Sequence, residues 1–158
     1  MNYTNVCTTA CSFCAFYRPR GHGEAYVLDR EQMAGKIEET LALGGIELLL
    51  QGGLHPDLGV EWYEDLFRWV KREYPAINLH ALSPEEIWHV ARTSQIPLGE
   101  TIDRLVAAGL DSIPGGGAEV LDDEVRRRIA PLKCSTDEWL TVMRAAHQRG
   151  LRSTATLM

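Results

Sequence analysis

The chain lacks any apolar run that approaches the roughly 18 to 20 residues a helix needs to cross a bilayer. Its N-terminus also lacks a basic segment followed by a long apolar one, which is the pattern of a secretory signal peptide. We therefore expect a cytosolic (cytoplasmic) protein with no membrane partner. In that compartment thiols stay reduced and available to bind metal.

Basic residues are not in excess either. Lys and Arg number 16 against 22 Asp and Glu, so the formal net charge is −6. Proteins that bind nucleic acid normally present surplus Lys and Arg to the phosphates, so a small molecule is the expected partner and nucleic acid is not. The chain also lacks a Gly-x-Gly-x-x-Gly pattern, a P-loop lysine and any internal repeat of roughly 20 to 50 residues. With 45% hydrophobic residues, it has the composition of an ordinary globular domain.

Cysteine is scarce, yet three of the four cysteines are clustered. Cys7, Cys11 and Cys14 follow the spacing C-x3-C-x2-C, and Phe13 directly precedes the last of them. Thiolates are soft ligands that suit iron–sulfur clusters, zinc or Cu(I). Because a cubane site ordinarily takes four cysteines, three would leave one iron without a protein ligand. The spacing therefore predicts a [4Fe–4S] cluster with one open iron.

Other interpretations of the three cysteines are weaker. They could be small buried hydrophobes on one helix face, but the intervening Thr8, Thr9 and Ser12 are poor helix formers. An odd trio without a signal peptide does not indicate disulfides. A structural zinc or electron-carrier domain without catalysis stays an alternative. Cys134 stands far from the trio, and we expect it to be structural.

The rest of the chain alternates predicted strands and helices. Capping-box patterns begin three of the helices, at Asp29, Ser83 and Ser135. The strands are expected at residues 2–6, 46–50, 77–82, 110–113 and 152–158. Helices are expected at residues 30–43 and 60–73, and two more within 85–108, divided near Pro97. Another is expected at 119–130, where the basic run Arg126–Arg128 would be a solvated face, and a last one after Ser135.

This alternation predicts an α/β fold with a parallel sheet and right-handed crossovers. The unusual stretches each follow a predicted strand: the cysteines, Gln51–Asp57, Ser83 and Pro114–Glu119. In β/α barrels, functional groups gather on the loops after the strands. We therefore expect these four stretches to form one site.

The cysteine motif resembles the signature of the radical S-adenosylmethionine (SAM) superfamily. Four further stretches are similar to its menaquinone and deazaflavin branch, and most of all to the dehypoxanthine futalosine cyclases; they are Asn2–Val6, Ala15–Arg18, Gln51–Asp57 and Ser112–Glu119. The resemblance covers the whole chain and implies a partial TIM-like (β/α)6 barrel, of which the first five β/α units are present. Residues 1–158 would then be a radical SAM core domain truncated at its C-terminus, with truncation at the N-terminus left open.

The resemblance also implies the chemistry. A reduced [4Fe–4S] cluster would cleave SAM to methionine and a 5′-deoxyadenosyl radical, which takes hydrogen from the ribose of dehypoxanthine futalosine so that the ring closes. Flavodoxin or ferredoxin would donate the electron. The alternatives within the branch are aminofutalosine synthase and the tyrosine-using part of deazaflavin (FO) synthase. A further alternative is that the excerpt is inactive by itself.

Individual site residues follow from the same resemblance. The cofactor-binding set comprises Phe13, Gln51, Gly52, Gly53, Ser83, Gly116 and Gly117. Gln51–Gly53 matches the glycine motif that contacts the methionine amino group of SAM, although Leu54 replaces the glutamate of many relatives. The catalytic candidates are His55 and His80 in proton transfer or substrate contact and Glu119 as an acceptor for hydroxyls. The alternatives are a loop cap for His55, a core histidine for His80 and a helix cap for Glu119.

Overall fold

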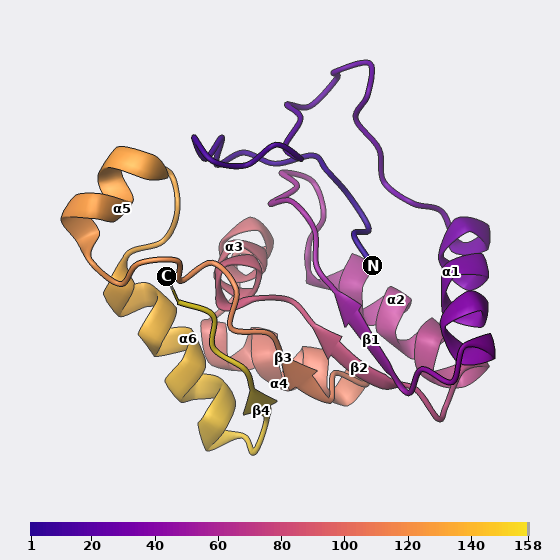
Figure 1. Ribbon diagram of the computed structural model, residues 1–158. Helices are drawn as coiled ribbons and strands as arrows, with labels where there is room; N and C mark the ends of the chain where they lie inside the picture. The colour runs from indigo at the N-terminus through magenta and orange to yellow at the C-terminus, as the bar shows by residue number, and fades with distance from the viewer. Residues whose placement is uncertain (158) are drawn as a thin grey trace.

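Four short parallel strands form one sheet in the order of the sequence, and the computed structural model describes residues 1–157 of the chain (Figure 1). The strands are β1 (Glu47–Leu50), β2 (Asn78–Ala81), β3 (Ser112–Ile113) and β4 (Arg152–Ser153). Each strand pairs in parallel with the next, and helices connect consecutive strands, as the alternation in the sequence predicts. Within the described residues, no helix is long and apolar enough to cross a membrane.

Six helices in the described residues accompany the sheet, and their bounds agree closely with the predicted ones except for the helix predicted at residues 119–130, which begins four residues later than expected, at Asp123. They are α1 (Arg30–Ala42), α2 (Val60–Glu73), α3 (Pro84–Ser94), α4 (Leu98–Ala108), α5 (Asp123–Ile129) and α6 (Thr136–Gln148). The three predicted capping boxes are all present, at Asp29, Ser83 and Ser135. Each satisfies backbone N–H groups that the first turn of a helix leaves free.

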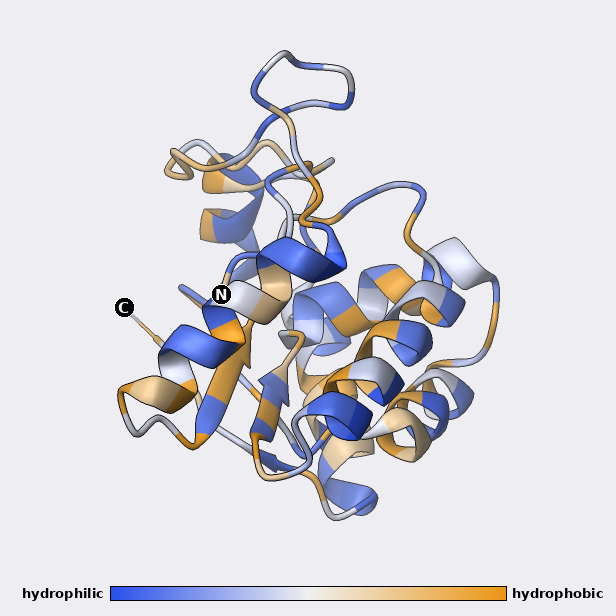
Figure 2. Cartoon of the chain, turned by 90° about the vertical axis from the view of Figure 1, so that its right-hand side faces the viewer, coloured by the Kyte–Doolittle hydropathy of each residue, from blue (hydrophilic) through white to orange (hydrophobic). Residues whose placement is uncertain are grey.

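Within residues 1–157, helices pack against one face of the sheet and leave the other open. Apolar side chains on the covered face belong to the hydrophobic core, namely Leu48, Leu50, Leu79, Ala81 and Ile113. The helices that contact one another over this core are α2, α3, α4 and α6. Figure 2 shows hydrophobic and hydrophilic residues interspersed along these helices and strands, as expected for elements with one buried face.

The opposite face of the sheet is mostly polar, although Leu49 is exposed on it. Side chains from the four strands line a cavity of about 490 Å³ there, including Glu47, Asn78, His80, Ser112 and Arg152. Asn78 donates to Glu47 at 2.6 Å, and His80 Nδ1 shares a hydrogen bond of 2.7 Å with Ser112. A helical layer on one face and a polar surface on the other is the arrangement of a barrel wall, in agreement with the predicted partial barrel.

The predicted first strand, residues 2–6, is present only as isolated bridges. Asn2 pairs in parallel with Gln51, and the Gly53 N–H donates to the Thr4 carbonyl at 2.9 Å, so this segment extends the sheet beyond β1. It forms no regular strand because Thr4 and Val6 pair instead with the long loop that follows the cysteines. That loop stands above the sheet in Figure 1 and is largely hydrophilic in Figure 2.

The predicted last strand, residues 152–158, is also shorter than expected. Regular pairing ends at Ser153, and Leu157 forms only a bridge with Glu119. Met158 lies outside the described residues. Similarly, β3 begins at Ser112 and not at Leu110, because Leu110 belongs to the turn that ends α4.

Candidate functional site

A cavity of about 230 Å³ opens at the C-terminal ends of the strands. Its walls come from segments far apart in the sequence. The lining residues are Asn2, Thr4, Asn5, Cys7, Thr9, Cys11, Phe13, Cys14, Phe16, Tyr17, Gln51, Gly52, Gly53, Leu54, Ser83, Glu85, Glu86, Gly117, Glu119 and Lys133. The four unusual stretches of the sequence therefore do meet in one place.

The cysteine loop forms one side of this cavity. Cys11 is buried, whereas Cys7 and Cys14 are half-buried, and all three are free thiols. The Thr9 hydroxyl lies 2.9 Å from the Cys7 sulfur and 3.7 Å from the Cys11 sulfur. Burial raises the pKa of the Cys11 thiol, and the Thr9 hydrogen bond and the Lys133 charge partly oppose that rise. These thiols therefore line the cavity with soft donor atoms.

The three thiols fit an iron–sulfur cluster by their chemistry, because thiolates are soft ligands. Among residues 1–157, no three His, Cys, Asp or Glu side chains converge as ligands of one metal ion would. That convergence is required of a mononuclear site such as zinc. In a [4Fe–4S] cube each thiolate binds a different iron, so the cysteines need only surround one space. Cys7, Cys11 and Cys14 all line the same cavity.

The glycines after β1 allow the cysteine loop to approach the sheet closely. A Cβ atom on Gly53 would lie 2.2 Å from the Val6 carbonyl oxygen, and one on Gly52 would lie 2.6 Å from the Tyr3 ring. Both distances are far inside van der Waals contact, so only glycine fits. On the other side of Gly53, the Thr8 N–H donates to the Leu54 carbonyl at 3.2 Å. These contacts fix the loop against the end of β1.

Glu86 connects three walls of the cavity. Its carboxylate accepts from Gly52 N–H at 2.8 Å, from the Tyr3 hydroxyl at 3.1 Å, and from the N–H and hydroxyl of Ser83, each at 2.7 Å. Burial raises the pKa of Glu86, and the hydrogen bonds from Ser83, Gly52 and Tyr3 oppose that rise. Glu86, the capping-box partner of Ser83, therefore also holds residues 2–6 and the glycine motif (Gln51–Gly53) together.

An ion pair also lines the cavity. The Lys133 ammonium donates to both carboxylate oxygens of Glu119 at 2.9 Å, and both side chains are largely buried. The same ammonium lies 5.5 Å from the centre of the Phe13 ring, a cation–π distance. Phe13 itself is 50% exposed and presents its ring to the cavity mouth.

Most of the predicted site residues lie on this cavity. They are Cys7, Cys11, Phe13, Cys14, Gln51, Gly52, Gly53, Ser83, Gly117 and Glu119. Gly116 lies just behind the wall, where a Cβ would be 2.7 Å from the Gln51 amide nitrogen. What these residues bind stays a prediction.

The two histidines lie elsewhere. His55 Nδ1 accepts from the Asp57 N–H at 3.1 Å, and the His55 carbonyl meets His89 Nε2 at 2.9 Å, outside the cysteine cavity. Burial lowers the pKa of His55. His80 lines the polar cavity on the open face of the sheet. Neither histidine shares a cavity with the cysteines, and their catalytic roles stay predictions.

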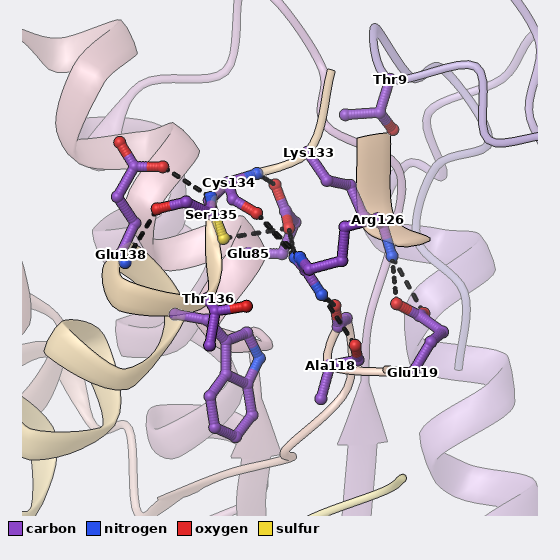
Figure 3. A network of polar contacts seen from close by, with 12 residues as sticks. Thr9, Glu85, Ala118, Glu119, Arg126, Lys133, Cys134, Ser135, Thr136 and Glu138 are labelled. Carbon is purple, nitrogen blue, oxygen red and sulfur yellow. Dashed lines mark hydrogen bonds and ion pairs between the residues drawn. The ribbon is translucent and has the colours of Figure 1, made fainter. Parts of the chain in front are cut away.

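Sequence reasoning missed Glu85, Arg126 and Lys133. The basic run of α5 was expected to be a solvated face, but this is wrong for Arg126, which is 5% exposed. Its guanidinium pairs with buried Glu85 and donates to backbone carbonyls (Figure 3). No local signal separates Arg126 from Arg127 and Arg128, because its burial depends on tertiary contacts.

Comparisons with known proteins agree with this geometry. The profile described as "Radical SAM superfamily" matches residues 1–158. The cyclic dehypoxanthine futalosine synthase of Halalkalibacterium halodurans is 48% identical over 158 residues, which are 100% of this chain and 43% of that protein. The 5-amino-6-(D-ribitylamino)uracil–L-tyrosine 4-hydroxyphenyl transferase of Methanothermobacter thermautotrophicus is 42% identical, with the same coverage. The chain thus spans less than half the length of these relatives.

Solved structures show the same fold. Methylornithine synthase aligns with a TM-score of 0.73 at 20% identity, over 97% of this chain and 42% of that one. The hydrogenase maturase HydG aligns with a TM-score of 0.74 at 14% identity, over 99% of this chain and 34% of that one. Radical SAM proteins use a [4Fe–4S] cluster and SAM. The match over the whole chain shows that it belongs to the radical SAM superfamily.

Proposed function

We propose that this chain forms the cofactor-binding core of an enzyme that cyclises dehypoxanthine futalosine to cyclic dehypoxanthine futalosine, a step of menaquinone biosynthesis. One observation carries the proposal: the three cysteines, the glycine motif and the Glu119–Lys133 pair line a single cavity. The 48% identity to the Halalkalibacterium halodurans synthase supports the choice of substrate.

In this proposal Cys7, Cys11 and Cys14 hold three irons of the cluster, and SAM occupies the adjoining space. When bound, these groups supply a 5′-deoxyadenosyl radical after one-electron reduction by an external carrier such as flavodoxin or ferredoxin. Gly52 and Gly53 let the backbone approach the methionine part of SAM, because no Cβ intervenes. Glu119 accepts from hydroxyl groups, and Phe13 shields the mouth of the cavity from water.

A second candidate is the tyrosine-using reaction of FO synthesis. The 42% identity to the Methanothermobacter thermautotrophicus transferase favours it, and the cofactor site would be the same. The difference between the two candidates therefore lies in the substrate and not in the cysteine cavity.

The test is product analysis by mass spectrometry. The full-length protein is reconstituted anaerobically with iron and sulfide and reduced in the presence of SAM. It then receives either dehypoxanthine futalosine or tyrosine with 5-amino-6-(D-ribitylamino)uracil. We expect 5′-deoxyadenosine and the cyclic product only with the first substrate. A tyrosine adduct without cyclisation would replace this proposal with the second candidate, and a colourless protein that makes no 5′-deoxyadenosine would contradict both.

A further inference from the structure

Arg126 lies at the centre of a buried polar network beside the cavity (Figure 3). Its guanidinium donates to the Cys134 carbonyl at 2.6 and 3.2 Å, to the Ala118 carbonyl at 2.7 Å and to the Gly117 carbonyl at 3.0 Å. A guanidinium is a rigid, planar set of five donors. Arg126 therefore fixes the distance between two loops, residues 117–120 and residues 133–134.

Glu85 ties the same two loops to the start of α3. Its carboxylate accepts from the Cys134 N–H at 2.9 Å and from the Cys134 thiol at 3.1 Å, and it lies 3.7 Å from the Arg126 Nη2. A Cβ on Gly117 would lie 3.0 Å from the Glu85 Cβ, so the first loop packs directly on this side chain. Helix α3 and both loops thus meet at one buried ion pair.

The two loops carry the charged pair that lines the cavity. Glu119 follows Ala118, and Lys133 precedes Cys134, so each lies one residue from a contact of Arg126 or Glu85. The backbone of Glu119 has a φ of 42°, in the left-handed region that a non-glycine residue adopts only when its surroundings hold it there. The direction of the Glu119 side chain therefore depends on the contacts that hold its loop.

We propose that Arg126, acting with Glu85, is a positioning residue that sets the place of the Glu119–Lys133 pair in the SAM site. The inference rests on the proposed cofactor site, because the pair contributes its acceptor and its cation to that cavity. Arg126 does not line the cavity itself and acts only through the two loops.

The experiment measures the SAM dissociation constant of the full-length, cluster-reconstituted protein from the change in its EPR signal on titration. We expect Arg126→Lys to weaken SAM binding about tenfold with unchanged iron content. Lysine keeps the positive charge but lacks the planar guanidinium that donates to both loops, so even this conservative substitution is expected to weaken SAM binding. The matched control is Arg128→Gln, which changes an exposed arginine of the same helix and is expected to leave the dissociation constant unchanged.

A double-mutant cycle separates positioning from general structural support. In a Lys133→Met background, Arg126→Lys is expected to cause no further weakening, because the pair it positions is already broken. An equal loss in both backgrounds, or an unchanged dissociation constant in Arg126→Lys, would overturn the inference. If Arg126→Lys does not fold, Arg126→Gln takes its place in the cycle, since its amide can still donate to a carbonyl of one loop but cannot span both.

The two proposals fail in different ways. A wild-type protein that binds no SAM overturns the proposed function and this inference with it. A wild-type protein that binds SAM, with variants that bind it equally well, overturns the inference alone.

Discussion

The Gly52 N–H donates to the Glu86 carboxylate at 2.8 Å, although 34 residues separate the two in the chain. This bond joins the glycine motif after β1 to the first turn of α3. The same carboxylate caps α3 through Ser83 and accepts from the buried Tyr3 hydroxyl. One side chain therefore sets the relative position of three walls of the cofactor cavity.

We expect Glu86→Gln to lower the free energy of unfolding by about 1–3 kcal/mol. Each carboxylate oxygen accepts from a backbone N–H, one from Gly52 and one from Ser83, so an amide NH₂ must face one of these donors. Urea denaturation measures the change. The control is Glu138→Gln, at the same capping position of α6, where the side chain has only Ser135 to satisfy. Equal losses in both variants would contradict the joining role of Glu86.

Gly53→Ala should lower stability by about 1–3 kcal/mol and reduce the iron bound after reconstitution. The added Cβ would lie 2.2 Å from the Val6 carbonyl oxygen and 2.8 Å from the Cys7 Cβ, so the cysteine loop must move. Iron analysis and thermal unfolding report the two effects. Gly35→Ala is the control, because nothing lies within 4 Å of its Cβ and it should stabilise α1 by about 1 kcal/mol. Full iron content in Gly53→Ala would show that the loop does not need this close approach.

The four cysteines should divide into two classes. Replacement of Cys7, Cys11 or Cys14 by alanine is expected to abolish the cluster absorbance, because in the proposed site each would hold a different iron. Cys134→Ala should keep the cluster, since this thiol lies outside the cavity, donates to Glu85 and has a pKa raised by burial. The iron and sulfide content of each reconstituted variant shows which cysteines the cluster needs. A loss of iron in Cys134→Ala as large as in the other three would assign it to the cluster.

We expect part of the free energy of unfolding to be lost at acidic pH because of Glu64. Hydrogen bonds from Arg104 lower the pKa of Glu64 below its ordinary value, so its contribution is present above that value and is lost as the pH falls through the lowered pKa. Glu64→Gln should cost about 1.5–3 kcal/mol near neutral pH. The difference from wild type should shrink in more acidic buffer.

Urea denaturation across a series of pH values measures that trend. Glu61→Gln is the control, because Glu61 pairs with the same arginine but its side chain is 72% exposed. A difference between Glu64→Gln and wild type that stays constant on acidification would contradict this role of the Arg104 bond.

The sequence predicts the regular elements well because their signals are local. A capping box such as Ser83 with Glu86 places a helix start to the residue, and an apolar run such as Leu48–Leu50 marks a strand, although Leu49 lies exposed on its open face. The cysteine spacing and the glycines likewise identify most of the cavity. Arg126 and Lys133 could not be found this way, since their roles depend on loops that meet only in three dimensions.

The cavity also has a consequence for the order of events during synthesis. Glu119 and Lys133 are synthesised more than a hundred residues after the three cysteines that share the cavity with them. Domains fold only when their distant segments are available, and such non-local assembly is slow. Until the Lys133 loop has been synthesised, the wall that carries Glu119 and Lys133 is missing and the cavity around the thiols is incomplete. If these cysteines bind the cluster as proposed, we expect its insertion to follow the synthesis of that loop.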